Sequence, residues 1–277
     1  MEYAPGVDFL FGGGTMTGRR IILGLLLGFA LALGLPGGSA SAGGTIGVVV
    51  LHGKDSKPPH RGVAAFASQL SSEGFLVETP EMPWSGRRGY DADYEQAMIE
   101  IDAAVARLKA RGATAIVVAG HSLGANAAIG YGARRPGLKA VVALAPGHTP
   151  DAQPLRDACA ESVARAKAMV AQGHGADTAT FVDGNHGQRF QRQAMARMYV
   201  SYFDPDGPAI IPRNAAKLTA PLLYVVGDSD PLSRLGADYA FAKAPANPAS
   251  KYASVSADHM GTPSAAADLV VAWLKGL

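Results

Sequence analysis

Three short segments of the sequence carry side chains suited to nucleophilic catalysis. They are GHSLG at 120–124, GDSDP at 227–231 and DHMG at 258–261. A serine hydroxyl is a poor nucleophile at neutral pH, so a base must remove its proton and a carboxylate must hold that base in place. Ser122, one of the two aspartates Asp228 and Asp230, and His259 follow one another in the order serine, acid, histidine. We therefore expect a catalytic triad with Ser122 as the nucleophile.

The glycines beside Ser122 indicate a sharp turn between a strand and a helix. A side chain at Gly120 or Gly124 would collide with neighbouring backbone in such a turn. The turn would lift the hydroxyl above the carboxyl end of a sheet, and the N–H groups of the following helix would face the charge that develops on a reacting carbonyl. We expect two main-chain donors for that oxyanion, the N–H groups of Leu123 and Lys54, and a solvated Lys54 ammonium.

Together with LHGK at 51–54, these segments resemble the α/β-hydrolase superfamily over essentially all of the chain after its first 44 residues. The resemblance implies a bacterial secreted or periplasmic serine hydrolase of the esterase or lipase kind. In that family the acid stands three positions after the glycine that here is Gly227. The resemblance thus assigns the acid to Asp230, leaving Asp228 to bond its own turn and Asp258 to cap a loop.

The order of apolar segments predicts an α/β fold, with a mostly parallel sheet and helices on both faces. The six predicted strands are 45–51, 75–79, 113–119, 140–144, 222–226 and 252–256. Helices are predicted at 61–73, at 90–111, directly after Ser122 and at 265–275. Residues 147–220 are too many for a simple connection, and helix-like stretches at 158–171 and 187–202 indicate an inserted cap. Because the chain enters at the strand before His52, the two leading strands of the family's eight-stranded sheet are expected to be missing.

Seven histidines are present, and one is needed as the base. His52 and His121 belong to the motif turns, where we expect them to hold loops by hydrogen bonding. With Trp84, which suits a core position equally well, they are also candidates for a substrate pocket. Four more histidines lie on loops or in the expected cap: His60, His148, His174 and His186. They lack the spacing of a metal site, so no metal is expected, and hydrolysis needs no cofactor.

The expected cap holds two further features. Arg189 and Arg192 stand three apart on a predicted helix, where they either lie on a solvated face, the simpler interpretation, or meet an anionic group of a substrate. Cys159 is the one cysteine of the chain, so no intramolecular disulfide is possible. It has no adjacent base motif and is expected to be a buried small residue.

The first 42 residues differ in composition from the rest and are typical of a targeting segment. Arg19 and Arg20 precede an uncharged stretch at 21–35, and small residues at 40–42 offer a cleavage site. A membrane span needs about 20 apolar residues, so a signal peptide cleaved after Ala42 is favoured over an anchor. We expect a periplasmic or secreted protein, with residues 43–277 as one α/β-hydrolase domain. Export by the Sec or the twin-arginine route, and translation from Met1 or Met16, both stay open.

The composition excludes some classes of function. With 48% hydrophobic and 17% charged residues the chain suits a globular domain with a sizeable core. The 25 basic and 23 acidic residues are interspersed, so no basic block points to nucleic acid, and a small molecule is the expected partner. We expect cleavage of a carboxylic ester through an acyl-enzyme. Amide or peptide hydrolysis by the same residues, and a non-catalytic binding role on the same scaffold, are the alternatives.

Overall fold

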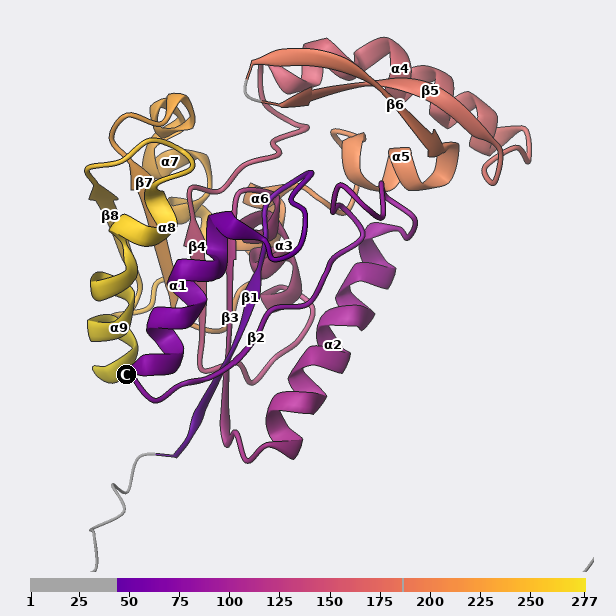
Figure 1. Cartoon of the computed structure of the whole chain (residues 1–277). Helices are drawn as coiled ribbons and strands as arrows, with labels where there is room; N and C mark the ends of the chain where they lie inside the picture. The colour runs from indigo at the N-terminus through magenta and orange to yellow at the C-terminus, as the bar shows by residue number, and fades with distance from the viewer. Residues whose placement is uncertain (1–43, 186) are drawn as a thin grey trace, which may run out of the picture. The chain divides into compact units, whose positions relative to one another are not determined.

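The central sheet has six strands, all parallel, in a computed structural model that describes residues 44–185 and 187–277 (Figure 1). The strand order is β2-β1-β3-β4-β7-β8. The bounds are β1 Ile46–Leu51, β2 Leu76–Glu78, β3 Ala115–His121, β4 Ala140–Leu144, β7 Leu222–Gly227 and β8 Lys251–Val255. These are the six predicted strands, with ends displaced by two residues at most. The predicted fold class is confirmed.

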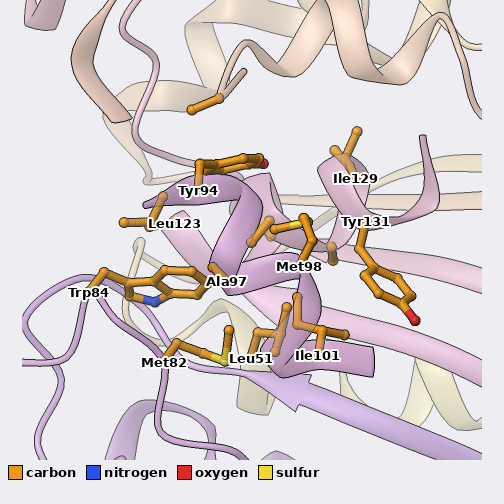
Figure 2. Packing of buried hydrophobic residues seen from close by; sticks show 14 of the residues in the cluster. Leu51, Met82, Trp84, Tyr94, Ala97, Met98, Ile101, Leu123, Ile129 and Tyr131 are labelled. Carbon is orange, nitrogen blue, oxygen red and sulfur yellow. The ribbon is translucent and has the colours of Figure 1, made fainter. Parts of the chain in front are cut away.

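The strands are apolar throughout because both faces of the sheet are covered. Along β1, Val48 and Val50 pack in one cluster with α1 (Arg61–Ser72) and α9 (Ala267–Lys275). The alternate residues Val49 and Leu51 pack in a second cluster with α2 (Tyr94–Ala110) and α3 (Leu123–Gly132). Alternation along a strand sends successive side chains to opposite faces, so two covered faces require a continuous apolar run. Figure 2 shows part of the second cluster, in which Leu51 lies beside Met82 and Ile101.

The start of α2 differs from the prediction, which placed it at Tyr90. Tyr90 has a φ of 64°, a left-handed conformation that a helix does not contain. Asp93 has extended backbone, and its side chain accepts a hydrogen bond from the Gln96 N–H at 2.8 Å. This is N-capping, which satisfies a donor that the first helical turn leaves unpaired. The cap therefore fixes the first helical residue at Tyr94, four residues later than the apolar spacing suggested.

Most of the segment between β4 and β7 forms a separate layer beyond the carboxyl ends of the strands, but its last helix packs against α3 (Figure 1). It contains α4 (Leu155–Ala171), the antiparallel pair β5 (Thr178–Asn185) and β6 (Gln188–Met195), α5 (Ala196–Phe203) and α6 (Ile211–Ala215). The helix predicted at 158–171 is confirmed. The helix predicted at 187–202 is wrong over its first half, which is β6. Gln and Arg are good helix formers, but pairing with β5 and burial of alternate β5 residues decide the conformation.

Short elements complete the described chain: η1 (Pro231–Leu235), α7 (Gly236–Tyr239), η2 (Phe241–Lys243) and α8 (Thr262–Ala265). The predicted signal peptide and its cleavage site at Ala42 lie outside the described residues, as does His186. In the ranges that are described, no helix has both the length and the apolar character needed to cross a bilayer.

Candidate active site

Ser122 occupies the single position between the end of β3 and the start of α3. Its φ of 56° and ψ of −121° place it in a sparsely populated region that folded proteins keep where surrounding contacts enforce it. A Cβ at Gly120 would lie 2.1 Å from the Gly124 carbonyl oxygen, and a Cβ at Gly124 would lie 2.3 Å from that of Leu51. Both distances are impossible for real atoms. The predicted reason for the two glycines is confirmed.

Asp230 and His259 meet although 28 residues separate them in the sequence. The His259 Nδ1 lies 2.7 Å from Asp230 Oδ2, and the Leu232 N–H donates to Asp230 Oδ1 at 2.9 Å. Burial by itself would raise the pKa of Asp230, but these hydrogen bonds and the neighbouring histidines hold it below its ordinary value. An ionised Asp230 can only accept, so His259 carries its proton on Nδ1 and keeps Nε2 available as a base.

The other two aspartates considered as acids serve local structure. Asp228 is exposed and accepts hydrogen bonds from the Ser256 hydroxyl and the Ala257 N–H, which ties the turn after β7 to the loop after β8. Asp258 accepts from the Gly261 N–H at 2.7 Å, the loop-capping role predicted for it. The histidine thus faces Asp230, at the position that the resemblance indicated.

Two cavities meet at Ser122. The smaller, of about 190 Å³, lies on the side of the β1 loop and is lined by His52, His121 and Met260 among others. The larger, of about 600 Å³, lies between the carboxyl ends of the strands and the β4–β7 segment. Ser122, His259, Lys54 and Asn185 line both. A serine with a cavity on each side has room for both halves of a molecule that it attacks in the middle.

Gly147 leaves space directly beside the serine hydroxyl. A Cβ at this position would lie 2.9 Å from Ser122 Oγ and 3.4 Å from His259 Cε1. The serine oxygen and the histidine ring therefore both lie against one small volume, which the missing side chain keeps open. This role was not predictable from the sequence, because a lone glycine in a loop has many possible reasons.

The predicted pocket residues divide into two groups. His52 and His121 line the smaller cavity, and both hold loops as predicted: the Met82 N–H donates to His52 Nε2 at 2.9 Å, and His121 Nε2 lies 2.8 Å from the His259 carbonyl oxygen. Trp84 lines neither cavity. It is fully buried in the core beside Met82 (Figure 2), with its indole N–H donating to the His52 carbonyl, so its assignment to the pocket is wrong.

The Lys54 ammonium is buried, contrary to the prediction that it is solvated. Its side chain is 4% exposed and donates to Asp183 Oδ1 and to the Gly184 carbonyl, both at 2.7 Å. Asp183, on β5, is fully buried. A single sequence could not show this pair, because 128 residues separate its members. The loop after β1 is thereby fixed to the β5–β6 hairpin.

Arg192 extends this contact into a network of four charges. It donates to Asp183 Oδ2 at 2.7 Å and, from its other end, to Asp55 in the loop after β1 at 2.8 Å. Burial alone would raise the pKa of Asp183, but the Lys54 and Arg192 charges hold it below its ordinary value. The network thus joins two basic side chains to two acidic ones. We define it by its members Lys54, Asp55, Asp183 and Arg192 and call it the hairpin network.

Arg189 and Arg192 were predicted to share a helical face. They do not, because both lie on the strand β6. Residues three apart on a strand point to opposite faces. Arg192 turns into the hairpin network, whereas Arg189 is exposed and lines the larger cavity. The interpretation as a solvated helix face is therefore wrong for Arg192.

The remaining predicted residues serve structure. His60 stacks on His52 at 3.9 Å between ring centroids, His148 is buried with Nε2 2.8 Å from the Tyr202 carbonyl, and His174 pairs with Asp177. Across residues 44–185 and 187–277, no three His, Cys, Asp or Glu side chains are grouped to hold a metal ion. Cys159 is buried as predicted, and burial raises the pKa of its thiol.

Comparison with known proteins identifies the family. The family model described as serine aminopeptidase, S33, matches residues 47–255. The chain belongs to this family. It is therefore a hydrolase of the α/β-hydrolase superfamily, as the motifs indicated. A search of curated protein sequences gives no match.

Solved structures share the fold at low sequence identity. One of the metagenome-derived lipolytic enzymes LipS and LipT has a TM-score of 0.61 and 14% identity, with 84% of this chain and 95% of that chain covered. The monoacylglycerol lipase of Paleococcus ferrophilus has 0.59 and 21%, with 84% and 96% covered. Est1E from Butyrivibrio proteoclasticus, solved with ferulic acid, has 0.54 and 19%, with 84% and 88% covered. At such identities the likeness concerns the fold.

Proposed function

We propose that this S33 family member is a serine hydrolase that cleaves a carboxylic ester through an acyl-enzyme. One observation carries the proposal: Ser122 sits on a strained turn where two cavities meet, and the histidine that lines the same cavities is held by a buried carboxylate at 2.7 Å. An oriented base beside a serine is the arrangement that turns a hydroxyl into a nucleophile.

In the proposed mechanism His259 Nε2 takes the proton of Ser122 as Oγ attacks the ester carbonyl. The tetrahedral intermediate collapses when the same proton passes to the leaving alcohol, which departs and leaves Ser122 acylated. A water molecule, deprotonated by His259, then attacks the acyl-enzyme. The acyl–Oγ bond breaks as the proton passes from His259 back to Ser122 Oγ, and the acid is released. Asp230 stays ionised and stabilises the imidazolium that forms in each half of the cycle.

The main-chain N–H groups of Leu123 and Lys54 are the proposed donors to the oxyanion. The first belongs to the first residue of α3, whose N–H has no partner within the helix, so the helix dipole adds to its effect. The second belongs to a loop that lines both cavities and that the Lys54 side chain anchors to Asp183. The side-chain contacts of the hairpin network therefore hold the loop that carries one of the proposed oxyanion donors.

The test is labelling and turnover of residues 43–277. We expect a fluorophosphonate probe to label Ser122 and p-nitrophenyl acetate to be hydrolysed, with both lost in Ser122→Ala. Ser229→Ala is the matched control, because Ser229 lies on an exposed turn and contacts only Asp228 through its hydroxyl. Full activity in Ser122→Ala would rule the mechanism out. Absence of labelling together with tight binding of a ligand would favour a non-catalytic role.

Amide or peptide hydrolysis is the second candidate, because the matched family is described as a serine aminopeptidase. An aminopeptidase must receive the ammonium group of its substrate, usually at a carboxylate. Among the described residues that line the two cavities, the carboxylates are Asp230 and Asp55, which His259 and Arg192 already occupy. This arrangement favours the ester. Comparing amino-acid p-nitroanilides with p-nitrophenyl esters on the same protein decides between the two.

We also propose that the protein is exported and that the mature chain begins at residue 43, from the composition of residues 1–42. Sequencing the N-terminus of the protein recovered from the periplasm or medium tests this. A chain that retains residues 21–35 in the membrane fraction would overturn it.

A further inference from the structure

The wall of the larger cavity carries two arginines that the proposed mechanism does not use. Arg189 comes from β6, and Arg234 comes from η1, directly after the turn that holds Asp230. Both side chains are exposed, and neither makes a hydrogen bond or an ion pair to any residue in the described ranges. Arg192, on the same strand as Arg189, is by contrast held by Asp183 and Asp55.

The charge around this cavity is one-sided. Among the described residues, the lysine and arginine side chains that line it are Lys54, Arg189 and Arg234, and Asp183 pairs with the first of them. Among the described lining residues the sole carboxylate is Asp230, which is committed to His259. Two uncompensated guanidinium groups therefore face a space that also contains Ser122. A cleft lined by charge of one sign concentrates ligands of the opposite sign.

Apolar side chains also form part of the wall, Leu155, Ala158, Leu232 and Leu235 among them, beside polar ones such as Gln153 and Gln188. A ligand that fits this wall has a hydrocarbon or aryl body. A planar guanidinium group binds carboxylates and phosphates through two parallel hydrogen bonds. The cavity thus combines an apolar path from the serine with cations along its wall.

We propose that the substrate is an anionic ester, with an apolar portion in the larger cavity and a carboxylate or similar anion at Arg189 and Arg234. This inference rests on the proposed esterase function and narrows its substrate class. It assigns to the two arginines a role in specificity, and none in the chemistry at Ser122.

The experiment compares matched esters that differ in one charge. On the acyl side, mono-p-nitrophenyl adipate, suberate and sebacate are each set against their methyl-capped counterparts. On the alcohol side, 4-acetoxybenzoate is set against its methyl ester. We expect about ten-fold higher kcat/KM for the charged member in at least one of the two series, because two exposed ion pairs each contribute a few-fold. The preference should shrink as salt is raised.

Three variants and one control test whether the two arginines cause the preference for the charged ester. Arg189→Gln and Arg234→Gln should each lower the preference about three-fold, and the double variant should abolish it, with turnover of the methyl-capped esters unchanged. Arg197→Gln, an exposed arginine of α5 that lines neither cavity, should leave it intact. Equal turnover of charged and capped esters in both series, or a preference that survives the double variant, overturns this inference while the esterase function stands. If no ester is hydrolysed and Ser122 is not labelled, the proposed function itself fails.

Discussion

Two buried aspartates hold the loops around Ser122, and they do so in different ways. Asp230 lies at the carboxyl edge of the sheet and holds one histidine. Asp183 lies on the hairpin beyond that edge and holds Lys54 and Arg192. The first contact joins the ends of adjacent strands β7 and β8, whereas the second joins the loop after β1 to a separate layer. Asp230 therefore orients the base His259, whereas Asp183 fixes the position of the loop after β1 relative to the β5–β6 hairpin.

Asp230→Asn gives the largest expected effect. An amide can donate to His259 Nδ1 and so favours the wrong tautomer, and we expect kcat to fall about 10³- to 10⁴-fold on p-nitrophenyl acetate. The loss of unfolding free energy should be smaller than that of Asp183→Asn, since no cation is left buried without a partner. Steady-state kinetics with urea unfolding measures both. A variant that keeps wild-type kcat would remove Asp230 from the triad.

Gly147→Ala tests the open space beside the Ser122 hydroxyl. Its Cβ would lie 2.9 Å from Ser122 Oγ, so the hydroxyl or the loop must move. A displacement of about 1 Å from reacting geometry can cost about 100-fold in rate, and we expect a loss of that order in kcat/KM. Gly187→Ala is the control, a position where a Cβ meets nothing within 4 Å, although its φ of 76° adds some strain there. Equal activity in wild type and Gly147→Ala would contradict this role.

Asp183→Asn should act on stability more than on chemistry. Removing one partner from a buried ion pair leaves an uncompensated charge, so we expect a loss of about 3 kcal/mol in unfolding free energy. Because Lys54 is then less firmly held, kcat should fall about ten-fold with KM little changed. Kinetics at a temperature where the variant remains folded separates the two effects. If kcat stays constant while stability falls, the hairpin network is structural only.

The acid sensitivity of stability tests the two buried histidines His52 and His148. Burial lowers the pKa of His148 to about 3, with the Lys54 charge as a second cause, and burial lowers that of His52 to about 4. The unfolded chain takes up these protons below about pH 6.5 and the folded chain does not. Unfolding free energy should therefore fall as pH drops from 6.5 toward 4, by up to about 1.4 kcal/mol per pH unit for each histidine.

Urea unfolding at pH 7.5 and at pH 5 measures this slope. His148→Gln should reduce it, because glutamine keeps a donor for the Tyr202 carbonyl without titrating. His174→Gln, at an exposed position, is the control that should keep the wild-type slope. An unchanged slope in His148→Gln would show that this histidine takes up its proton as readily in the folded protein as in the unfolded chain.

Sequence patterns predicted the sheet well because its determinants are local. Each strand is a short apolar run whose length and spacing follow from burial on both faces, as in Val48 to Leu51. The turn at Ser122 was also predictable from the sequence. A Cβ at Gly120 or Gly124 would collide with backbone atoms that are close in sequence or belong to the adjacent strand. The β5–β6 hairpin was misread because its residues are ordinary helix formers, and only cross-strand pairing makes them strands.

What the sequence by itself determined, then, is the α/β fold class and the motif positions, Ser122, His259 and an acid at Asp228 or Asp230, all shortly after predicted strands. The family resemblance narrowed the acid to Asp230. The tertiary structure decided that Asp230 and His259 meet, that Trp84 is core, and that Lys54 is buried against Asp183. It also decided which charges face the larger cavity. The physical reason is range: backbone sterics and apolar periodicity act within a few residues, whereas ion pairs and cavity walls join side chains that only the folded chain brings together.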